Sequence, residues 1–99
     1  MLDGAAGLLA NIKKLKSDLG DIIEPDFGLL DHLLSLEVLN YRQFANIRSA
    51  RTVFDRNDVL LELLVSEDQC EKFVKALQQT DQQHVVNVIT QNGGQEHHM

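Results

Sequence analysis

Residues 29–65 read LLDHLLSLEVLNYRQFANIRSARTVFDRNDVLLELLV, and this stretch decides the fold that the sequence predicts. Its leucines recur at intervals of three and four residues near both ends, at Leu30, Leu33 and Leu34 and again at Leu60, Leu63 and Leu64. This spacing places apolar side chains on one face of a helix. Phe44 and Ile47 add one apolar turn between the two patterns. The stretch therefore predicts a short helix between two longer ones, as in a compact helical bundle.

An apolar pattern before this stretch predicts a first helix of about five turns with a bend. Its apolar positions are Leu8, Ile12, Leu15, Leu19 and Ile22. Glycine weakens a helix by about 1 kcal/mol relative to alanine, so Gly20 places the expected bend near residues 17–20. Pro25 ends the helix, because the residue before a proline is disfavoured in the α conformation. The second helix is expected to begin at Pro25 or Asp26 and to run to about Leu36.

Four later helices are predicted from their first residues. Each start places a capping side chain three residues before an acid or amide, in Asn40–Gln43, Thr52–Asp55, Ser66–Gln69 and Thr80–Gln83. In such a capping box the side chain of the first residue accepts a hydrogen bond from a backbone N–H of the first helical turn. The side chain of the fourth residue accepts a hydrogen bond from the backbone N–H of the first residue. The predicted helices cover residues 41–48, 53–64, 67–78 and 81–91. Residues 1–91 are thus predicted to form one all-α domain, a six-helix antiparallel bundle with a bent first helix, and residues 92–99 a polar tail or linker.

Composition limits the classes of partner. A chain of 99 residues, 43% hydrophobic and 24% charged, fits one globular domain. Its formal charge of −6 argues against nucleic acid and anionic membrane as main partners. Its longest apolar runs are far shorter than a bilayer span, and its first residues lack the basic segment of a signal peptide. We therefore expect a cytoplasmic protein without a membrane or nucleic-acid partner.

Reactive and metal-binding residue types form no recognisable site in the sequence. Cys70, the single cysteine, lies on a predicted core stripe among acidic residues, which raise a thiol pKa, so we expect a small buried hydrophobe. The histidines, His32, His84, His97 and His98, show no zinc-ligand spacing. The sequence offers no combination of a nucleophile, a general base and oxyanion-hole donors that would form a catalytic site. We expect no enzymatic activity, no cofactor, no metal and no small-molecule substrate.

A set of spaced apolar positions continues through the whole predicted bundle. It comprises Leu29-Leu30-Asp31, Leu34, Val38-Leu39, Phe44, Ile47-Arg48, Val59-Leu60, Leu63-Leu64, Cys70, Phe73, Leu77, His84-Val85 and Ile89. Through this set, roughly residues 8 to 90 resemble the caspase recruitment domain (CARD) of the death-fold superfamily. Two sister families fit less well. Death effector domains carry an element like Arg56–Asp58 on a different helix, and pyrin domains usually replace the third helix with a longer loop.

Charged residues are sorted by sign along the chain. Residues 17–41 hold six acidic residues and no Lys or Arg, whereas residues 42–56 hold four arginines and one acid. Two patches of opposite sign on one rigid body can join copies head to tail, and an open helical filament results if the rotation does not close. An exposed ion pair contributes about 0–1 kcal/mol, so several contacts must act together.

The resemblance implies where such contacts lie. In the CARD family the first and fourth helices of one copy bind the second and third helices of the next. The basic side would be Lys13, Lys14, Arg51 and Arg56, and the acidic side Asp26, Asp31 and Glu37. A secondary contact would place Arg42 near Glu67 and Asp68 of a neighbour.

The implied function is a homotypic CARD–CARD interaction module, a signalling adaptor that recruits or nucleates assemblies in apoptosis or in inflammatory and innate immune signalling, such as an inflammasome. Its partners would be other CARD domains, and oligomerisation could extend to a helical filament. One alternative is a decoy or inhibitory CARD that caps a partner assembly. A small helical nucleic-acid-binding domain is a different class, but its recognition region, residues 81–91, carries no Lys or Arg to contact phosphates.

Overall fold

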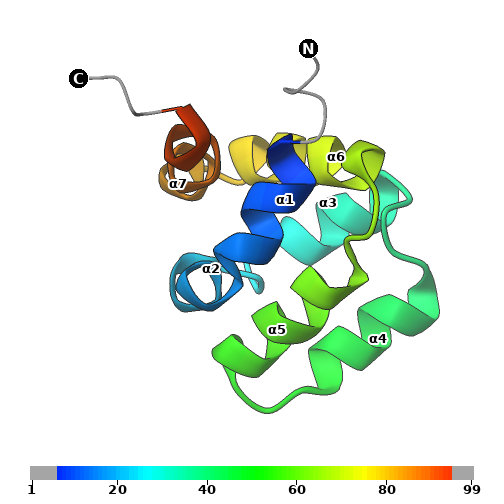
Figure 1. Ribbon diagram of the computed structural model, residues 1–99. Coiled ribbons are helices and arrows are strands. Elements are labelled where there is room, and N and C mark those ends of the chain that lie inside the picture. The colour runs from blue at the N-terminus through cyan, green and yellow to red at the C-terminus, as the bar shows by residue number, and fades with distance from the viewer. Residues whose placement is uncertain (1–6, 95–99) are drawn as a thin grey trace.

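The computed structural model describes residues 7–94, with side chains up to Gln91, and this part of the chain is entirely helical between its connections (Figure 1). The helices are α1 Gly7–Lys14, α2 Lys16–Ile22, α3 Leu29–Ser35, α4 Tyr41–Ser49, α5 Val53–Leu63, α6 Glu67–Gln79 and α7 Gln83–Gly94. The predicted all-α class is confirmed. The predicted first helix is present as two, α1 and α2, so six expected helices correspond to seven in the structure.

The helices enclose one apolar core. α1 packs on α6 and α7, α2 on α5, and α3 on α6, while α4 lies at the edge of the bundle against α3 and α5 (Figure 1). The largest fully buried side chains come from every helix, and they include Ile12, Leu19, Leu33, Ile47, Leu60, Phe73, Leu77, Val85 and Ile89. The periodic stripes predict most of them. Removing this surface from water is the main stabilising term, at about 25 cal/mol per Å².

The bend in the first helix lies at Leu15, not at residues 17–20. Leu15 has φ −99° and ψ 14°, which ends α1 and begins α2. Gly20 is instead buried inside α2, where a Cβ atom would lie 2.9 Å from Cε1 of Phe54. Gly20 therefore serves packing between α2 and α5, because only a residue without a side chain allows so close an approach.

The helix expected at Pro25 or Asp26 begins later, at Leu29. Residues 26–28 form a turn that ends at Gly28, whose φ of +104° lies in the left-handed region that glycine adopts without steric cost. Nδ1 of His32 lies 2.9 Å from the Gly28 carbonyl oxygen. The turn leaves Phe27 outside the core with 81% of its surface exposed.

Three of the four predicted helix starts are confirmed. The boxes Asn40–Gln43 and Ser66–Gln69 make both reciprocal hydrogen bonds. The Thr52–Asp55 box is formed in its forward half, where the Asp55 N–H donates to Oγ1 of Thr52 over 3.0 Å.

The predicted box at Thr80 is wrong. Thr80 ends α6, and its hydroxyl donates to the carbonyl of Ala76 over 2.9 Å. The nearly buried Gln82 bonds to both backbone groups of Glu24, each at 2.8 Å, so its amide fastens the α2–α3 connection to the start of α7. α7 continues to Gly94, three residues beyond the predicted end, and residues 95–99 of the predicted tail lie outside the described residues.

Candidate protein-interaction surface

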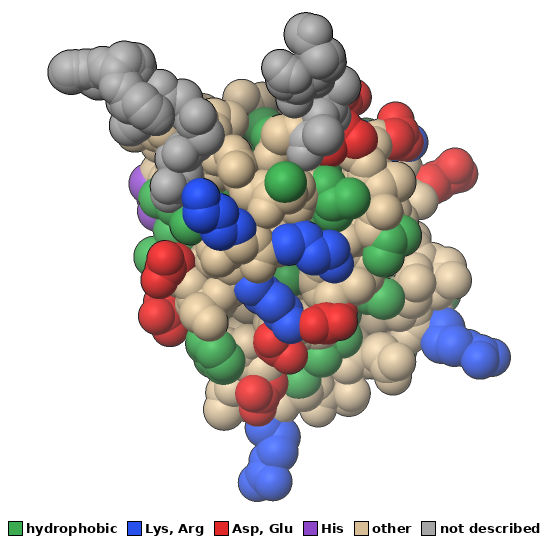
Figure 2. Space-filling model, viewed as in Figure 1, with side chains coloured by type: hydrophobic (Ala, Val, Ile, Leu, Met, Phe, Trp, Pro, Cys, Tyr) green, Lys and Arg blue, Asp and Glu red, His purple; other side chains and the backbone are tan. Residues whose placement is uncertain are grey.

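The predicted basic residues of α1 stay at the surface. Lys13 and Lys14 are exposed at the end of α1. Lys16, at the start of α2, pairs with Asp58 over 3.0 Å and with Glu62. The hydrogen bonds that the Lys16 ammonium donates to the carboxylates of Glu62 and Asp58 raise the pKa of Lys16. Figure 2 shows Lys or Arg side chains gathered over α1 and α2, with acidic side chains beside them.

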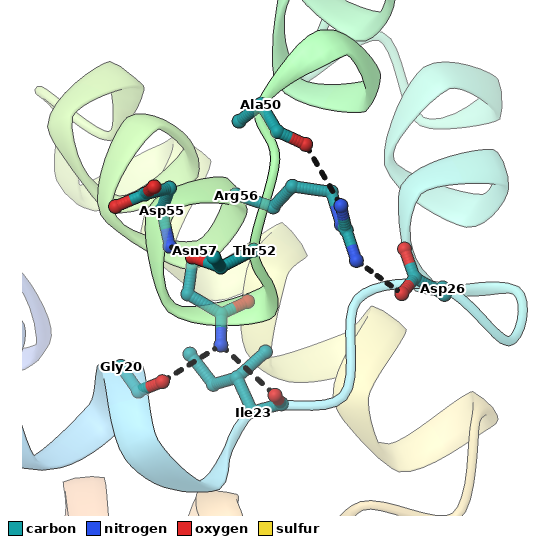
Figure 3. A network of polar contacts seen from close by, with 8 residues as sticks. All are labelled: Gly20, Ile23, Asp26, Ala50, Thr52, Asp55, Arg56 and Asn57. Carbon is teal, nitrogen blue, oxygen red and sulfur yellow. Dashed lines mark hydrogen bonds and ion pairs between the residues drawn. The ribbon is translucent and has the colours of Figure 1, made fainter.

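Arg56 and Asp26 contact each other within one molecule (Figure 3). Nη2 of Arg56 donates to Oδ2 of Asp26 over 3.0 Å, and Nη1 donates to the carbonyl of Ala50 over 2.8 Å. The sequence analysis assigns Arg56 to a basic side and Asp26 to an acidic side, and within one molecule the two residues form an ion pair. The turn at residues 26–28 lies against the first turn of α5, so the two charges neutralise each other. Nothing in the sequence signals this pairing between residues far apart in the chain.

Asn57 makes the central polar contact between α2 and α5. Its side chain is fully buried, and Nδ2 donates to the carbonyls of Gly20 over 3.0 Å and Ile23 over 2.9 Å (Figure 3). It thereby satisfies carbonyl groups that the end of a helix leaves without partners. The sequence analysis missed this residue. A signal exists, because Asn57 occupies the apolar stripe of α5 three residues before Leu60.

The residues proposed for the secondary contact are mostly engaged within the molecule. The Glu67 carboxylate accepts bonds from the N–H groups of Leu8, over 3.0 Å, and Leu9, over 3.1 Å, and so caps α1 from the start of α6. Asp68 pairs with Lys72 over 3.3 Å. Arg42 is exposed on α4, and no carboxylate of residues 7–91 lies within 4 Å of it.

The other predicted contact residues remain at the surface in separate regions. Asp31 in α3 and Glu37 in the following connection are exposed, as is Arg51. Arg51 belongs to the α4–α5 connection, which lies at the opposite end of the bundle from α1 (Figure 1). Lys13 and Lys14 at the end of α1 and Arg51 before α5 thus come from different elements of the bundle.

The outer side of α4 carries an aromatic and cationic surface that the sequence analysis did not identify. Tyr41 is 75% exposed, its ring meets that of Phe44 edge to face at 6.2 Å, and the Arg48 guanidinium lies 5.6 Å from the Phe44 ring centre. A shallow depression of about 500 Å³ is lined by Tyr41, Phe44, Ala45, Arg48 and Ser49, which we call the α4 face. The spacing of Tyr41, Phe44 and Arg48 by three and four residues is the signal that could have revealed it.

Cys70 is fully buried in the core. Burial, with a further contribution from Glu67, raises the pKa of its thiol to about 11. The thiol is therefore protonated at neutral pH, and the predicted direction of the shift is confirmed. In the described part of the chain, no group of three or more His, Cys, Asp or Glu side chains could hold a metal ion. None of the helices between residues 7 and 94 combines the length and the apolar character needed to cross a membrane.

Comparison with known protein families places most of the chain in one family model. The family model described as "Caspase recruitment domain" matches residues 8–92. The match begins in α1 and ends in α7, so it covers every helix described above. No curated protein and no solved structure matches the chain.

Proposed function

The chain belongs to the caspase recruitment domain family, and from this membership we propose that it recruits or nucleates CARD assemblies in apoptotic or inflammatory signalling. Members of this family act through protein–protein interaction in death-fold signalling and are not a catalytic family. The proposed partners are other CARD domains, including further copies of this chain, and the proposed setting is the cytoplasm.

The observation that carries the proposal is the separation of surface charges that have no ion-pair partner among residues 7–91. Asp31 and Glu37 lie on and after α3, whereas Lys13, Lys14 and Arg51 lie on α1 and before α5. A surface of one sign on one copy can meet a surface of the other sign on the next, which gives a heterologous contact. Charge pairs at the rim of a contact mainly set its register and rate of formation, so we expect assembly to weaken with salt.

The proposed mechanism is a concentration effect. Clustering of a host protein raises the local concentration of its CARD, so that weak contacts between copies become occupied together. The bundle then serves as the template on which partner CARDs add.

A second candidate, a decoy that binds a partner CARD without propagating, is favoured by the Arg56–Asp26 pair. This ion pair removes one charge from each of the two proposed surfaces. A copy with two weakened surfaces would associate poorly with its own kind and would still bind a partner with stronger ones.

Sedimentation velocity and electron microscopy of the chain over a range of concentration and salt test these proposals. Asp31→Arg and Arg51→Glu should each abolish self-association, and a mixture of the two variants should form complexes of limited size through the intact surfaces. Lys75→Glu, on an exposed part of α6 outside the proposed surfaces, is the matched control. If both variants assemble like the unchanged chain, these residues are not the contact. Monomers at every concentration, with a stoichiometric partner complex, would support the decoy.

A further inference from the structure

The connection between α4 and α5, residues 50–52, exposes the side chain of Thr52. The backbone is extended at both ends of this connection, with φ −69° and ψ 147° at Ala50 and φ −118° and ψ 161° at Thr52. The Thr52 hydroxyl oxygen accepts a bond from the Asp55 N–H over 3.0 Å, so its own O–H is not used in the cap. An exposed and extended segment can enter the cleft of an enzyme while the helices beside it stay folded.

Three arginines flank this hydroxyl group. Arg48 and Arg51 come before it, both are exposed, and neither has a carboxylate within 4 Å among the described residues. Arg56 follows one helical turn later, and its backbone N–H donates to the Thr52 carbonyl over 2.9 Å. Side chains four residues apart on a helix are neighbours, and Nη1 of Arg56 already bonds to the carbonyl of Ala50 in the same connection (Figure 3).

The Arg56 guanidinium has one donor without an acceptor. Its two terminal nitrogens bond to Ala50 and Asp26, but Nε is buried and has no hydrogen-bond partner in the part of the chain that the structure describes. A buried donor that lacks a partner costs free energy. A phosphate group carries three acceptor oxygens and pairs with guanidinium groups through parallel hydrogen bonds. A phosphate on Thr52 would bring such acceptors to the arginine one turn along the helix.

Two other hydroxyl groups at helix ends lack these surroundings. Ser66 caps α6 as Thr52 caps α5, accepting from the Gln69 N–H over 3.1 Å, but residues 57–71 contain no Lys or Arg. Ser49 belongs to the last turn of α4, where its hydroxyl donates to the Asn46 carbonyl over 2.8 Å. Of the three, only Thr52 combines an extended backbone with flanking arginines.

We propose that Thr52 is a phosphorylation site for an arginine-directed serine/threonine kinase, and that the phosphate draws Arg56 away from Asp26. Oγ1 of Thr52 attacks the γ-phosphorus of ATP, and the bond from that phosphorus to the β,γ-bridging oxygen breaks. ADP leaves, and the hydroxyl proton passes to the general base of the kinase. The inference goes beyond the proposed assembly function, because it concerns a modification of the single molecule.

Charge and position favour the phosphate over Asp26 as the partner of Arg56. A phosphothreonine carries a charge of about −1.5 to −2 at neutral pH, against −1 for a carboxylate. It would also lie at the N-terminal end of α5, where the helix dipole favours negative charge. Since Asp26 ties the turn at residues 26–28 to α5 through Arg56, phosphorylation should loosen that turn from the helix.

The first experiment maps the modification. The full chain, folded by circular dichroism, is incubated with ATP, Mg²⁺ and the catalytic domain of an arginine-directed kinase, and the phosphate is located by mass spectrometry. We expect one phosphate per chain, on Thr52. Joint replacement Arg48→Gln and Arg51→Gln should lower the initial rate by about tenfold or more, because these side chains supply the charge that the kinase recognises.

Lys75→Gln is the matched control for loss of charge, since Lys75 is exposed on α6, and it should leave the rate unchanged. Phosphate on Ser49 or Ser66 instead of Thr52, or none on the folded chain, would overturn the inference. An unchanged rate without the two arginines would overturn the assignment of the kinase class.

The second experiment tests the exchange of partners by thermal unfolding at concentrations where the chain is monomeric. Asp26→Asn removes the charge that Arg56 meets, so it should lower the melting temperature of the unmodified chain by about 2–4 °C. In the phosphorylated chain Arg56 is held by the phosphate, and the same substitution should shift the melting temperature by less than half as much. Asp31→Asn, at an exposed position of α3, should have no effect in either form.

Equal effects of Asp26→Asn with and without the phosphate would show that Arg56 stays with Asp26, which overturns the exchange. Both experiments use the monomer, so their failure leaves homotypic assembly standing. A chain that never self-associates leaves this inference intact.

Discussion

The contact between α2 and α5 and the α4 face contain similar side chains in opposite situations. Between α2 and α5, Lys16, Arg56 and Asn57 all have partners on the other segment. On α4, Tyr41, Arg42 and Arg48 point away from the bundle and pair at most with an aromatic ring of their own helix. The polar groups between α2 and α5 stabilise the fold, whereas those on α4 are free to contact a partner protein.

This difference predicts two kinds of mutational effect. A buried polar group that loses its partner carries the full cost of desolvation, whereas an exposed one is satisfied by water. Substitutions between α2 and α5 should therefore change folding stability, and substitutions on α4 should change association alone. The following predictions test that division.

The largest effect is expected for Asn57→Ala. The substitution leaves the carbonyls of Gly20 and Ile23 without donors and opens a space in a buried contact. We expect the free energy of unfolding to fall by about 2–3 kcal/mol, measured by urea denaturation. Asn46→Ala, at an exposed position of α4, is the matched control and should change stability by less than about 0.5 kcal/mol. Equal effects of both substitutions would contradict the division.

A smaller effect is expected from Gly20→Ala, and its sign should depend on Phe54. Alanine favours the helix by about 1 kcal/mol, but its Cβ would press on the Phe54 ring at 2.9 Å. In the unchanged chain the ring must move, so we expect no net gain. In a Phe54→Ala background the clash is absent, and Gly20→Ala should then stabilise by roughly 0.5–1 kcal/mol. A double-mutant cycle by thermal unfolding measures this coupling; additive effects would show that Gly20 does not serve packing.

The fold could be predicted from the sequence wherever the deciding contacts are local. Asn40 and Ser66 cap helices through bonds to residues three positions away, so α4 and α6 were placed to within one residue. The predicted start of α3 at Pro25 or Asp26 is wrong because Gly28 takes a left-handed conformation, and the sequence alone does not distinguish this from a continuous helix. The predicted box at Thr80 is wrong because the Thr80 hydroxyl can bond to the preceding helix as readily as to the following one.

The interaction surface was less predictable because it depends on contacts between distant segments. The sequence order put Arg56 and Asp26 in different charge blocks, and packing of α5 against the turn before α3 brought them to 3.0 Å. The sequence analysis identifies Phe44 as part of an apolar helical turn, and in the structure its ring both packs against the core and lines the α4 face. The order of charged residues in the sequence thus shows where charges of one sign cluster along the chain. The tertiary contacts determine which of these residues form ion pairs within the molecule.

Lys16 provides a smaller, pH-dependent test of the α2–α5 contact. The carboxylates of Glu62 and Asp58 raise the pKa of Lys16 above its ordinary value of 10.5. The pairs therefore contribute fully below about pH 10.5 and lose their contribution as the pH rises through the higher folded-state pKa. The stability difference between the unchanged chain and Lys16→Met should shrink above that pH in urea denaturation. A constant difference would mean that the aliphatic stem of Lys16, rather than its charge, joins the helices.

The smallest effect on stability is expected for Arg42→Glu. The variant Arg56→Glu, which reverses an arginine that has partners within the molecule, serves as the comparison. Arg42 has no carboxylate within 4 Å among the described residues, so its reversal should change the free energy of unfolding by less than about 0.5 kcal/mol. Arg56 bonds to Asp26 and to the Ala50 carbonyl and is half-buried, so its reversal should cost about 1–2 kcal/mol. Urea denaturation and sedimentation velocity are measured on the same samples.

At temperatures where both variants are folded, Arg42→Glu should weaken self-association more than Arg56→Glu does. This order is the reverse of their expected effects on stability. Arg42→Glu reverses an exposed charge on α4 that the proposed secondary contact places against a neighbouring CARD, so self-association should weaken although stability is unchanged. Arg56→Glu should affect association only to the extent that it loosens the turn at residues 26–28, which precedes Asp31 of the proposed acidic surface. If Arg42→Glu destabilises the fold and leaves association unchanged, the α4 face stabilises the fold as the α2–α5 contact does. The proposed difference between the two regions is then wrong.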